Sequence, residues 1–238
     1  MNPTLILGDC FDVLPTLPDG IADMVLADLP YGTTACKWDT TLASQGLWSE
    51  LLRVTKPQGA LVFTATQPFS SALLMSAKNI YRYSWYYQGS KGWLRWFDEV
   101  LVFYRKTPTY NPQGLVKVDR AMYNTATTRG GDSLRGDTEE TAGRGALRTK
   151  GHTYTQEFTG YPNQLLSFKS GGKTIHPTQK PVALFEYLIR TYTNEGDIVL
   201  DPCAGVLTTA VACQNSGRHA ICIERDPGYF EKGKGRLT

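Results

Sequence analysis

A carboxylate, a proline turn and an aromatic ring follow one another near the start of the chain, in Asp28-Leu29-Pro30-Tyr31-Gly32. Asp28 supplies an anionic acceptor, the Leu29 carbonyl a second acceptor, and Tyr31 a flat face. Two acceptors on the hydrogens of a ring-bound amine draw its nitrogen toward tetrahedral geometry and stabilise the positive charge that develops as it attacks. The chemistry indicated is alkylation of an amine, and an ordinary turn is the alternative.

A second acidic turn, Asp201-Pro202-Cys203-Ala204-Gly205, lies near the other end of the chain. A strand that enters a tight turn and then a helix brings backbone N–H groups close to a ligand. Glu224 follows Gly205 by nineteen positions, just beyond the next predicted strand, where an acid accepts hydrogen bonds from a ribose diol. The pattern predicts a nucleoside-containing cofactor. The dinucleotide fingerprint G-x-G-x-x-G is missing, which disfavours nicotinamide and flavin enzymes, and an Asp-Pro turn with a helix cap is the structural alternative.

Short apolar runs and helical spacings alternate around both turns. Strands are predicted at residues 5–7, 24–27, 60–64, 100–104, 197–200 and 220–223, and helices at 10–17, 42–54, 181–193 and 208–215. This alternation predicts an open, mostly parallel α/β sheet with helices on both faces, whose ligands lie beyond the carboxyl ends of the strands. Both acidic turns fall at those ends.

Composition limits the class of protein. The 238 residues, 41% of them hydrophobic, can bury a good core. No stretch approaches the roughly 18 apolar residues of a spanning helix, and Met1-Asn2-Pro3-Thr4 lacks the features of a secretory signal, so a cytoplasmic protein without a membrane partner is expected. The five cysteines are scattered without a CxxC pair and the three histidines stand far apart, so neither a disulfide framework nor a metal site is expected.

The middle of the chain differs in character. Residues 85–172 hold twelve Lys or Arg against eight Asp or Glu, in a chain whose net charge is +3. Residues 107–173 are rich in Gly, Thr, Arg and Asn and show little periodicity, which predicts loops. Long loops in compact proteins are usually lids, binding segments or linkers, so residues 111–150 are the candidate contact with a large partner. Ordinary scatter of charge is the alternative.

These segments together carry a resemblance to a known family. Asp28-Leu29-Pro30-Tyr31 resembles the D/N-P-P-Y/F catalytic motif of S-adenosylmethionine-dependent amino methyltransferases that act on DNA, and the turn at 201–205 resembles their D-P-F-x-G cofactor motif. Residues 176–181 are similar to the motif before the cofactor strand, and residues 217–224 to the ribose-binding strand. With the catalytic motif first and the cofactor motif last, the order is that of the circularly permuted beta group.

The resemblance implies a Rossmann-like class I methyltransferase fold. Residues 1–84 and 173–238 would form the catalytic and cofactor-binding domain, and residues 85–172 an inserted, loop-rich target recognition region. The implied reaction transfers a methyl group from S-adenosylmethionine to adenine N6 in double-stranded DNA, with the target base flipped out of the duplex. Adenine is expected because an initial Asp in the catalytic motif goes with adenine in this family and an initial Ser with cytosine. The implied setting is a bacterial or phage-infected cell, and the beta group often dimerises, which leaves a homodimer open.

The family's roles transfer position by position. The predicted catalytic set is Asp28, Leu29, Pro30 and Tyr31, in which Asp28, the Leu29 carbonyl and Tyr31 would hold the flipped base. Asp201 and Gly205 would line the methionine end of the cofactor, Glu224 would bind ribose and Asp9 would contact adenine. The full predicted cofactor set is Asp9, Asp28, Thr178, Lys180, Asp201, Cys203, Ala204, Gly205, Thr208, Glu224 and Arg225.

The chain also departs from the family's pattern. The cofactor motif continues Gly205-Val206-Leu207-Thr208-Thr209 where the family reads G-S-G-T-T, so a leucine stands at a glycine position and could crowd the methionine moiety. Leu29 replaces a proline, and Cys203 is interpreted as a packing residue because it lies inside the cofactor turn. Three alternatives stay open: an N4-cytosine enzyme, a protein or RNA methyltransferase, and a catalytically weakened DNA-binding relative.

Overall fold

The computed structural model describes residues 2–30, 45–88, 97–124, 128–129, 147–148, 152–168, 175 and 179–237. The chain divides into two compact units, one formed by Met1–Gln113 with Asn163–Thr238 and the other by Gly114–Pro162. The division expected from the sequence, at residues 85 and 172, assigns function rather than compactness and stays a prediction. The larger unit contains both acidic turns.

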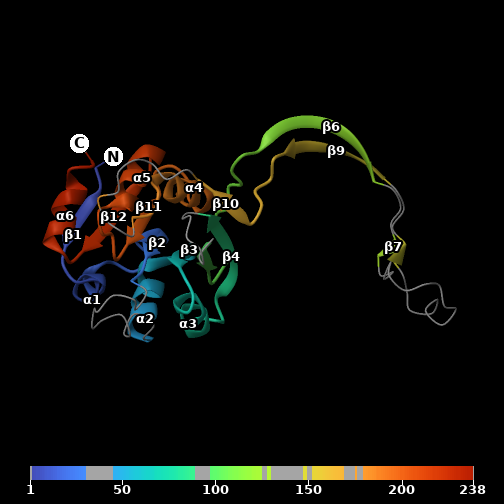
Figure 1. Ribbon diagram of the computed structural model, residues 1–238. Coiled ribbons are helices and arrows are strands. Elements are labelled where there is room, and N and C mark those ends of the chain that lie inside the picture. The colour runs from blue at the N-terminus through green and yellow to red at the C-terminus, as the bar shows by residue number, and fades with distance from the viewer. Residues whose placement is uncertain are drawn as a thin grey trace. The chain divides into compact units, whose positions relative to one another are not determined.

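The larger unit is built on an eight-stranded sheet with the order β1-β12-β11-β2-β3-β5-β4-β10 (Figure 1). Its strands are β1 (Thr4–Leu7), β2 (Ala22–Asp28), β3 (Thr55–Ala65), β4 (Tyr81–Gln88), β5 (Asp98–Phe103), β10 (Leu165–Ser167), β11 (Ile198–Asp201) and β12 (His219–Glu224). Strand β5 is antiparallel to both of its neighbours, β3 and β4, and the other neighbouring pairs are parallel. The expected open, mostly parallel sheet is confirmed.

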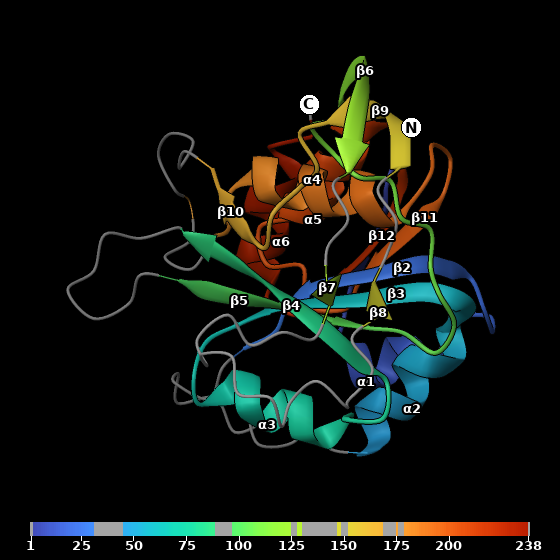
Figure 2. The ribbon, with the colours of Figure 1, turned by 90° about the vertical axis from the view of Figure 1, so that its right-hand side faces the viewer.

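Helices cover both faces of this sheet (Figures 1 and 2). The helices are α1 (Cys10–Val13), α2 (Gln45–Val54), α3 (Phe69–Ser76), α4 (Val182–Tyr192), α5 (Thr208–Ser216) and α6 (Pro227–Lys234), with a 3₁₀ turn at Leu14–Thr16. Met24 and Leu26 of β2 pack in the cluster that contains α4 and α5, whereas Val25 and Ala27 pack in the cluster that contains α1, α2 and α3. Because successive side chains of a strand point to opposite faces, a continuous apolar run is what a strand covered on both sides requires.

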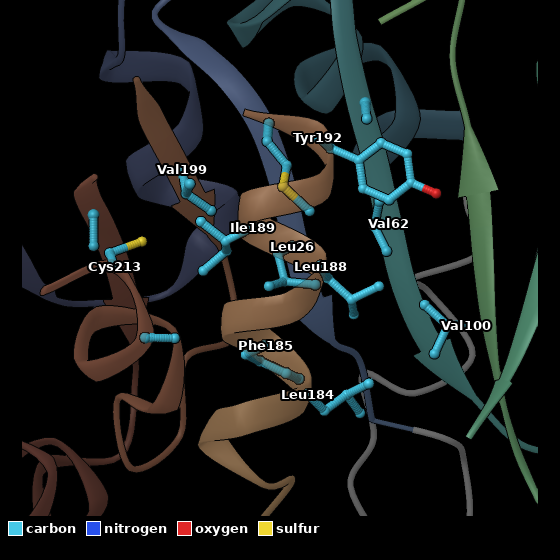
Figure 3. Packing of buried hydrophobic residues seen from close by; sticks show 14 of the residues in the cluster. Leu26, Val62, Val100, Leu184, Phe185, Leu188, Ile189, Tyr192, Val199 and Cys213 are labelled. Atoms are coloured by element: carbon cyan, nitrogen blue, oxygen red, sulfur yellow. The ribbon is translucent and has the colours of Figure 1, made fainter. Parts of the chain in front are cut away.

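A buried tyrosine ties α4 to the sheet. Tyr192 is fully buried among apolar side chains that include Leu26, Val62 and Leu188 (Figure 3). Its hydroxyl accepts a hydrogen bond from the Trp85 Nε1 at 2.7 Å and pairs with the Tyr83 hydroxyl at 2.8 Å. Burial raises the pKa of the Tyr192 hydroxyl well above its ordinary value, so the group stays neutral and its partners satisfy it inside the core.

The smaller unit contains strands where the sequence predicted loops. Strands β6 (Val116–Asn124) and β9 (His152–Thr159) pair as an antiparallel ribbon, and β7 (Thr128–Arg129) pairs with β8 (Leu147–Arg148). Helices α3 and α6 of the larger unit were also not predicted. None of the helices in the described part of the chain is long and apolar enough to cross a membrane.

Candidate active site

The sheet brings the two acidic turns to one edge. Val199 and Leu200 of β11 pair in parallel register with Met24 and Val25 of β2, so Asp201 and Asp28 lie at the carboxyl ends of neighbouring strands. Strands β12 and β1 follow in order and end near Glu224 and Asp9. Four predicted site acids therefore lie along the carboxyl edge of four adjacent strands, where ligands of open α/β sheets bind.

Two carboxylates shape the turn between β11 and α5. Asp201 accepts a hydrogen bond from the Cys203 N–H at 3.0 Å and another from the Thr209 hydroxyl. Glu224 accepts from the Gly205 N–H and, with its other oxygen, from the Asp226 N–H, both at 2.7 Å. The turn is therefore held from both sides by the acids that the sequence assigned to the cofactor.

Gly205 leaves room above this turn. Its φ of +52° lies in the left-handed region that glycine adopts without strain, and among the described residues no heavy atom beyond the two adjoining residues lies within 4 Å of the position that a Cβ would occupy. Backbone and acidic groups thus border open space.

The electrostatics of the turn favour a cationic ligand. The pKa of Asp201 is raised to about 7, chiefly by burial. The hydrogen bonds from Thr209 and Cys203 lower this pKa, and the negative charges of Asp28 and Glu224 raise it. Burial also raises the pKa of Glu224. Positive charge placed beside these groups would stabilise their ionised forms.

Asp28 accepts hydrogen bonds from two directions. The Thr64 hydroxyl, on the neighbouring strand β3, donates to one oxygen, and the Lys180 ammonium lies 3.0 and 3.2 Å from the two oxygens. Lys180 is buried and also lies 3.7 Å from a carboxylate oxygen of Asp98. Leu29 is buried and Pro30 half-buried after Asp28, whereas Tyr31 lies outside the described residues, so its role as a stacking ring stays a prediction.

The remaining members of the predicted set lie around this edge. Asp9 caps α1 by accepting from the Phe11 N–H at 3.0 Å, and its carboxylate lies 3.7 Å from the half-exposed Arg225 guanidinium. Thr208 begins α5, and its hydroxyl accepts from Arg236 at 3.1 Å. Ala204 is buried within the turn, and Thr178 lies outside the described residues.

Cys203 has the surroundings of a packing residue. Its side chain packs against the apolar cluster that covers α1, and its thiol shares a hydrogen bond with the Cys10 thiol. That bond and burial raise the pKa of Cys203 well above its ordinary value, which keeps it a thiol and a poor nucleophile.

Leu207 directs its side chain into the core. Its φ of +58° is the conformation that a glycine would adopt freely, yet the side chain is fully buried in the cluster that contains α4 and α5. The isobutyl group therefore does not lie in the open space beside Gly205, which removes the physical reason for expecting it to crowd a ligand there.

Thr64 and Asp98 are contacts of the site that sequence reasoning missed. Thr64 lies near the end of β3, which extends beyond the strand predicted at residues 60–64, and its neighbour across the β2–β3 register is Asp28. Strand order was the missing information, because apolar runs predict strands but not which ones pair.

Known proteins resemble this chain along almost its whole length. A family model described as DNA methylase, N6_N4_Mtase, matches residues 22–234. The Type II methyltransferase M.HpaI of Haemophilus parainfluenzae is 28% identical over 258 residues, covering 100% of this chain and 74% of that protein.

Solved structures with less sequence identity share the fold. The crystal structure of the M1.HpyAVI–SAM complex superposes with a TM-score of 0.64 at 22% identity, covering 99% of this chain and 98% of that one. The cytosine-N4-specific PvuII DNA methyltransferase gives a TM-score of 0.70 at 15% identity, covering 100% of this chain and 87% of that one.

Proposed function

The chain belongs to the DNA methylase family of N6-adenine and N4-cytosine methyltransferases, and from this premise we propose that it methylates adenine N6 in duplex DNA with S-adenosylmethionine as donor. One observation carries the proposal: the Asp28 turn and the Asp201–Gly205 turn end adjacent parallel strands at one edge of the sheet. A methyl acceptor on Asp28 and a donor on the second turn would then meet across a single edge.

The residues at this edge fit the donor. S-adenosylmethionine carries a positive sulfonium and a positive ammonium group. The acids Asp201, Glu224 and Asp28 make the electrostatic potential at this edge of the sheet more negative, which favours such a ligand. The open space above Gly205 lets backbone approach a ligand as a side chain there would not. The Asp201–Gly205 turn would hold the methionine end, Glu224 the ribose and Asp9 the adenine. When bound, the cofactor supplies an electrophilic methyl group.

The chain's own groups then act on the acceptor amine. The lone pair of an exocyclic base amine is delocalised into its ring, so the amine is a weak nucleophile. Acceptance of its hydrogens by Asp28 and the Leu29 carbonyl localises the lone pair, and the Asp28 charge stabilises the cation that forms. The amine of a base that is stacked inside a DNA duplex cannot reach the site. The base is therefore flipped out of the duplex, with Tyr31 as the proposed stacking partner.

Adenine is proposed over cytosine because the motif begins with Asp28. The N4-cytosine alternative keeps a specific support, since the PvuII enzyme shares this fold. Transfer of labelled methyl groups to unmodified genomic DNA, followed by separation of the nucleosides, decides between them. N6-methyladenine is expected; N4-methylcytosine would establish the alternative, and no label in duplex DNA would contradict both.

The proposal extends to the region between the two turns. Residues 85–172 are proposed as the target recognition region that contacts duplex DNA, in a bacterial or phage-infected cell. A protein or RNA methyltransferase would instead transfer the label to protein or RNA when these replace DNA in the assay.

A further inference from the structure

Lys180 lies between two carboxylates that come from different strands. Its ammonium is 3.0 Å from the nearer oxygen of Asp28, at the end of β2, and 3.7 Å from an oxygen of Asp98, at the start of β5. The exposed fractions of the three side chains are 9% for Lys180, 21% for Asp28 and 25% for Asp98. A nearly buried ammonium needs such partners, because burying an unpaired charge is costly.

The two carboxylates do not share Lys180 equally. Both Asp28 oxygens lie within hydrogen-bond distance of the ammonium, at 3.0 and 3.2 Å, whereas Asp98 is at ion-pair distance only. The distances from the ammonium to the nearest oxygens of Asp28 and Asp98 differ by less than an ångström, so a small rotation of the Lys180 side chain brings the ammonium to hydrogen-bond distance of Asp98. Asp98 is therefore a second position for the same ammonium.

The position of the ammonium matters for the reaction proposed above, on which this inference rests. Asp28 stabilises the cation that forms on the attacking amine, and a lysine charge about 3 Å away opposes that effect, strongly so where water is excluded. Movement of Lys180 toward Asp98 would weaken this opposing effect and free an Asp28 oxygen to accept a hydrogen bond from the amine.

We propose that Asp98 is a positioning residue that acts through Lys180: it draws the ammonium away from Asp28 when the base amine docks there. Before docking, Lys180 and Thr64 hold the Asp28 carboxylate in place. During transfer, Lys180 pairs with Asp98 and the amine replaces it on Asp28.

The test compares Asp98→Asn with Asp98→Glu and with Glu186→Gln on α4. Asp98→Asn removes the charge that attracts Lys180, so kcat for methyl transfer falls about tenfold or more while KM for DNA changes little. Asp98→Glu restores most of the rate. Glu186→Gln removes the same charge from α4, where the Glu186 carboxylate accepts a hydrogen bond from the Asn215 side chain, and keeps the parental kcat.

A double-mutant cycle asks whether Asp98 acts through Lys180. In the Lys180→Met background the Asp98→Asn change has little further effect on kcat, because the ammonium that it directs is gone. A parental kcat for Asp98→Asn, or an equal loss with and without Lys180, overturns the inference. Where Lys180→Met is too slow to measure, the Asp98 variants decide alone: loss of kcat in both Asn and Glu variants, or a loss expressed in KM, contradicts it.

The same assays separate this inference from the proposed function. A parent protein that labels no DNA overturns both. A parent that labels DNA, with Asp98→Asn as fast as the parent, overturns the role of Asp98 alone.

Discussion

The side chain of Leu207 occupies the space that a Cβ atom on Gly233 would need. A Cβ built on Gly233 would lie 2.5 Å from Leu207 Cγ and 2.9 Å from the backbone carbon of Val206. Helix α6 therefore carries a glycine where it passes the segment between β11 and α5, and that segment carries a leucine whose side chain fills the gap. The pair explains how a leucine is accommodated at a position where the resemblance to the family predicts glycine.

Replacing Leu207 by glycine should destabilise the fold without tightening cofactor binding. Loss of a buried leucine side chain costs about 2–5 kcal/mol, and relief of the left-handed backbone returns about 1–2 kcal/mol, so the free energy of unfolding falls. Chemical denaturation measures the free energy of unfolding, and calorimetric titration measures the affinity for S-adenosylmethionine, which should not increase. The rate of methyl transfer should stay at least equal to that of the parent. Tighter binding at unchanged stability would show that the isobutyl group lies in the cofactor site after all.

Replacing Gly233 by alanine should also destabilise the protein. The new Cβ meets backbone as well as the Leu207 side chain, so overpacking costs about 1–3 kcal/mol of unfolding free energy. Gly228→Ala is the matched control in the same helix, because the nearest atom to its Cβ among the other described residues is a side-chain oxygen of Asp226, at 3.1 Å, and not backbone. Equal melting temperatures for the two variants would contradict the packing described here.

Local patterns predicted most of the sheet and the acids at its edge. Strand β2 is apolar through Ala27 and ends in Asp28, and both features are visible in a few consecutive residues. The contacts of Asp28 could not be predicted from the sequence. Thr64 lies beside Asp28 because β3 pairs with β2, and Lys180 lies beside it because of the path of the chain before α4. Strands β6 and β9 were missed for the same reason, because each is stabilised by pairing with the other across a long stretch of sequence.

Replacing Gly205 by alanine should weaken cofactor binding strongly but destabilise the fold only slightly. Its positive φ makes any side chain strained by about 1 kcal/mol, yet no atom of the described residues beyond its two neighbours lies within 4 Å of the Cβ position. Gly196→Ala is a close control, because Gly196 has a φ of +85° and equally open surroundings at the other end of β11. Both variants should lose similar stability, while only Gly205→Ala weakens cofactor binding, by about tenfold or more. Equal affinities would place the cofactor elsewhere.

Asp201 should give the protein a distinctive dependence of stability on pH. Its folded pKa of about 7 lies above the ordinary value of 3.8, so the folded state binds the proton more tightly than the unfolded state. The resulting stabilisation is complete below about pH 4 and is lost as the pH rises through about 7. Asp201→Asn cannot ionise, so its unfolding free energy should fall less between pH 4 and 8, as denaturation at several pH values would show. Parallel profiles for the two proteins would contradict this.

The central claim is that Asp28 faces a methyl donor at the shared edge of β2 and β11, and loss of transfer on removing its carboxylate tests it most directly. The measurement is labelled-methyl transfer from S-adenosylmethionine to unmodified DNA by the parent, by Asp28→Ala, and by Asp23→Ala at the other end of the same strand. We expect Asp28→Ala to lose transfer by about a hundredfold or more while remaining folded, and Asp23→Ala to retain it. An Asp28→Ala protein that methylates DNA at the parental rate would contradict the account.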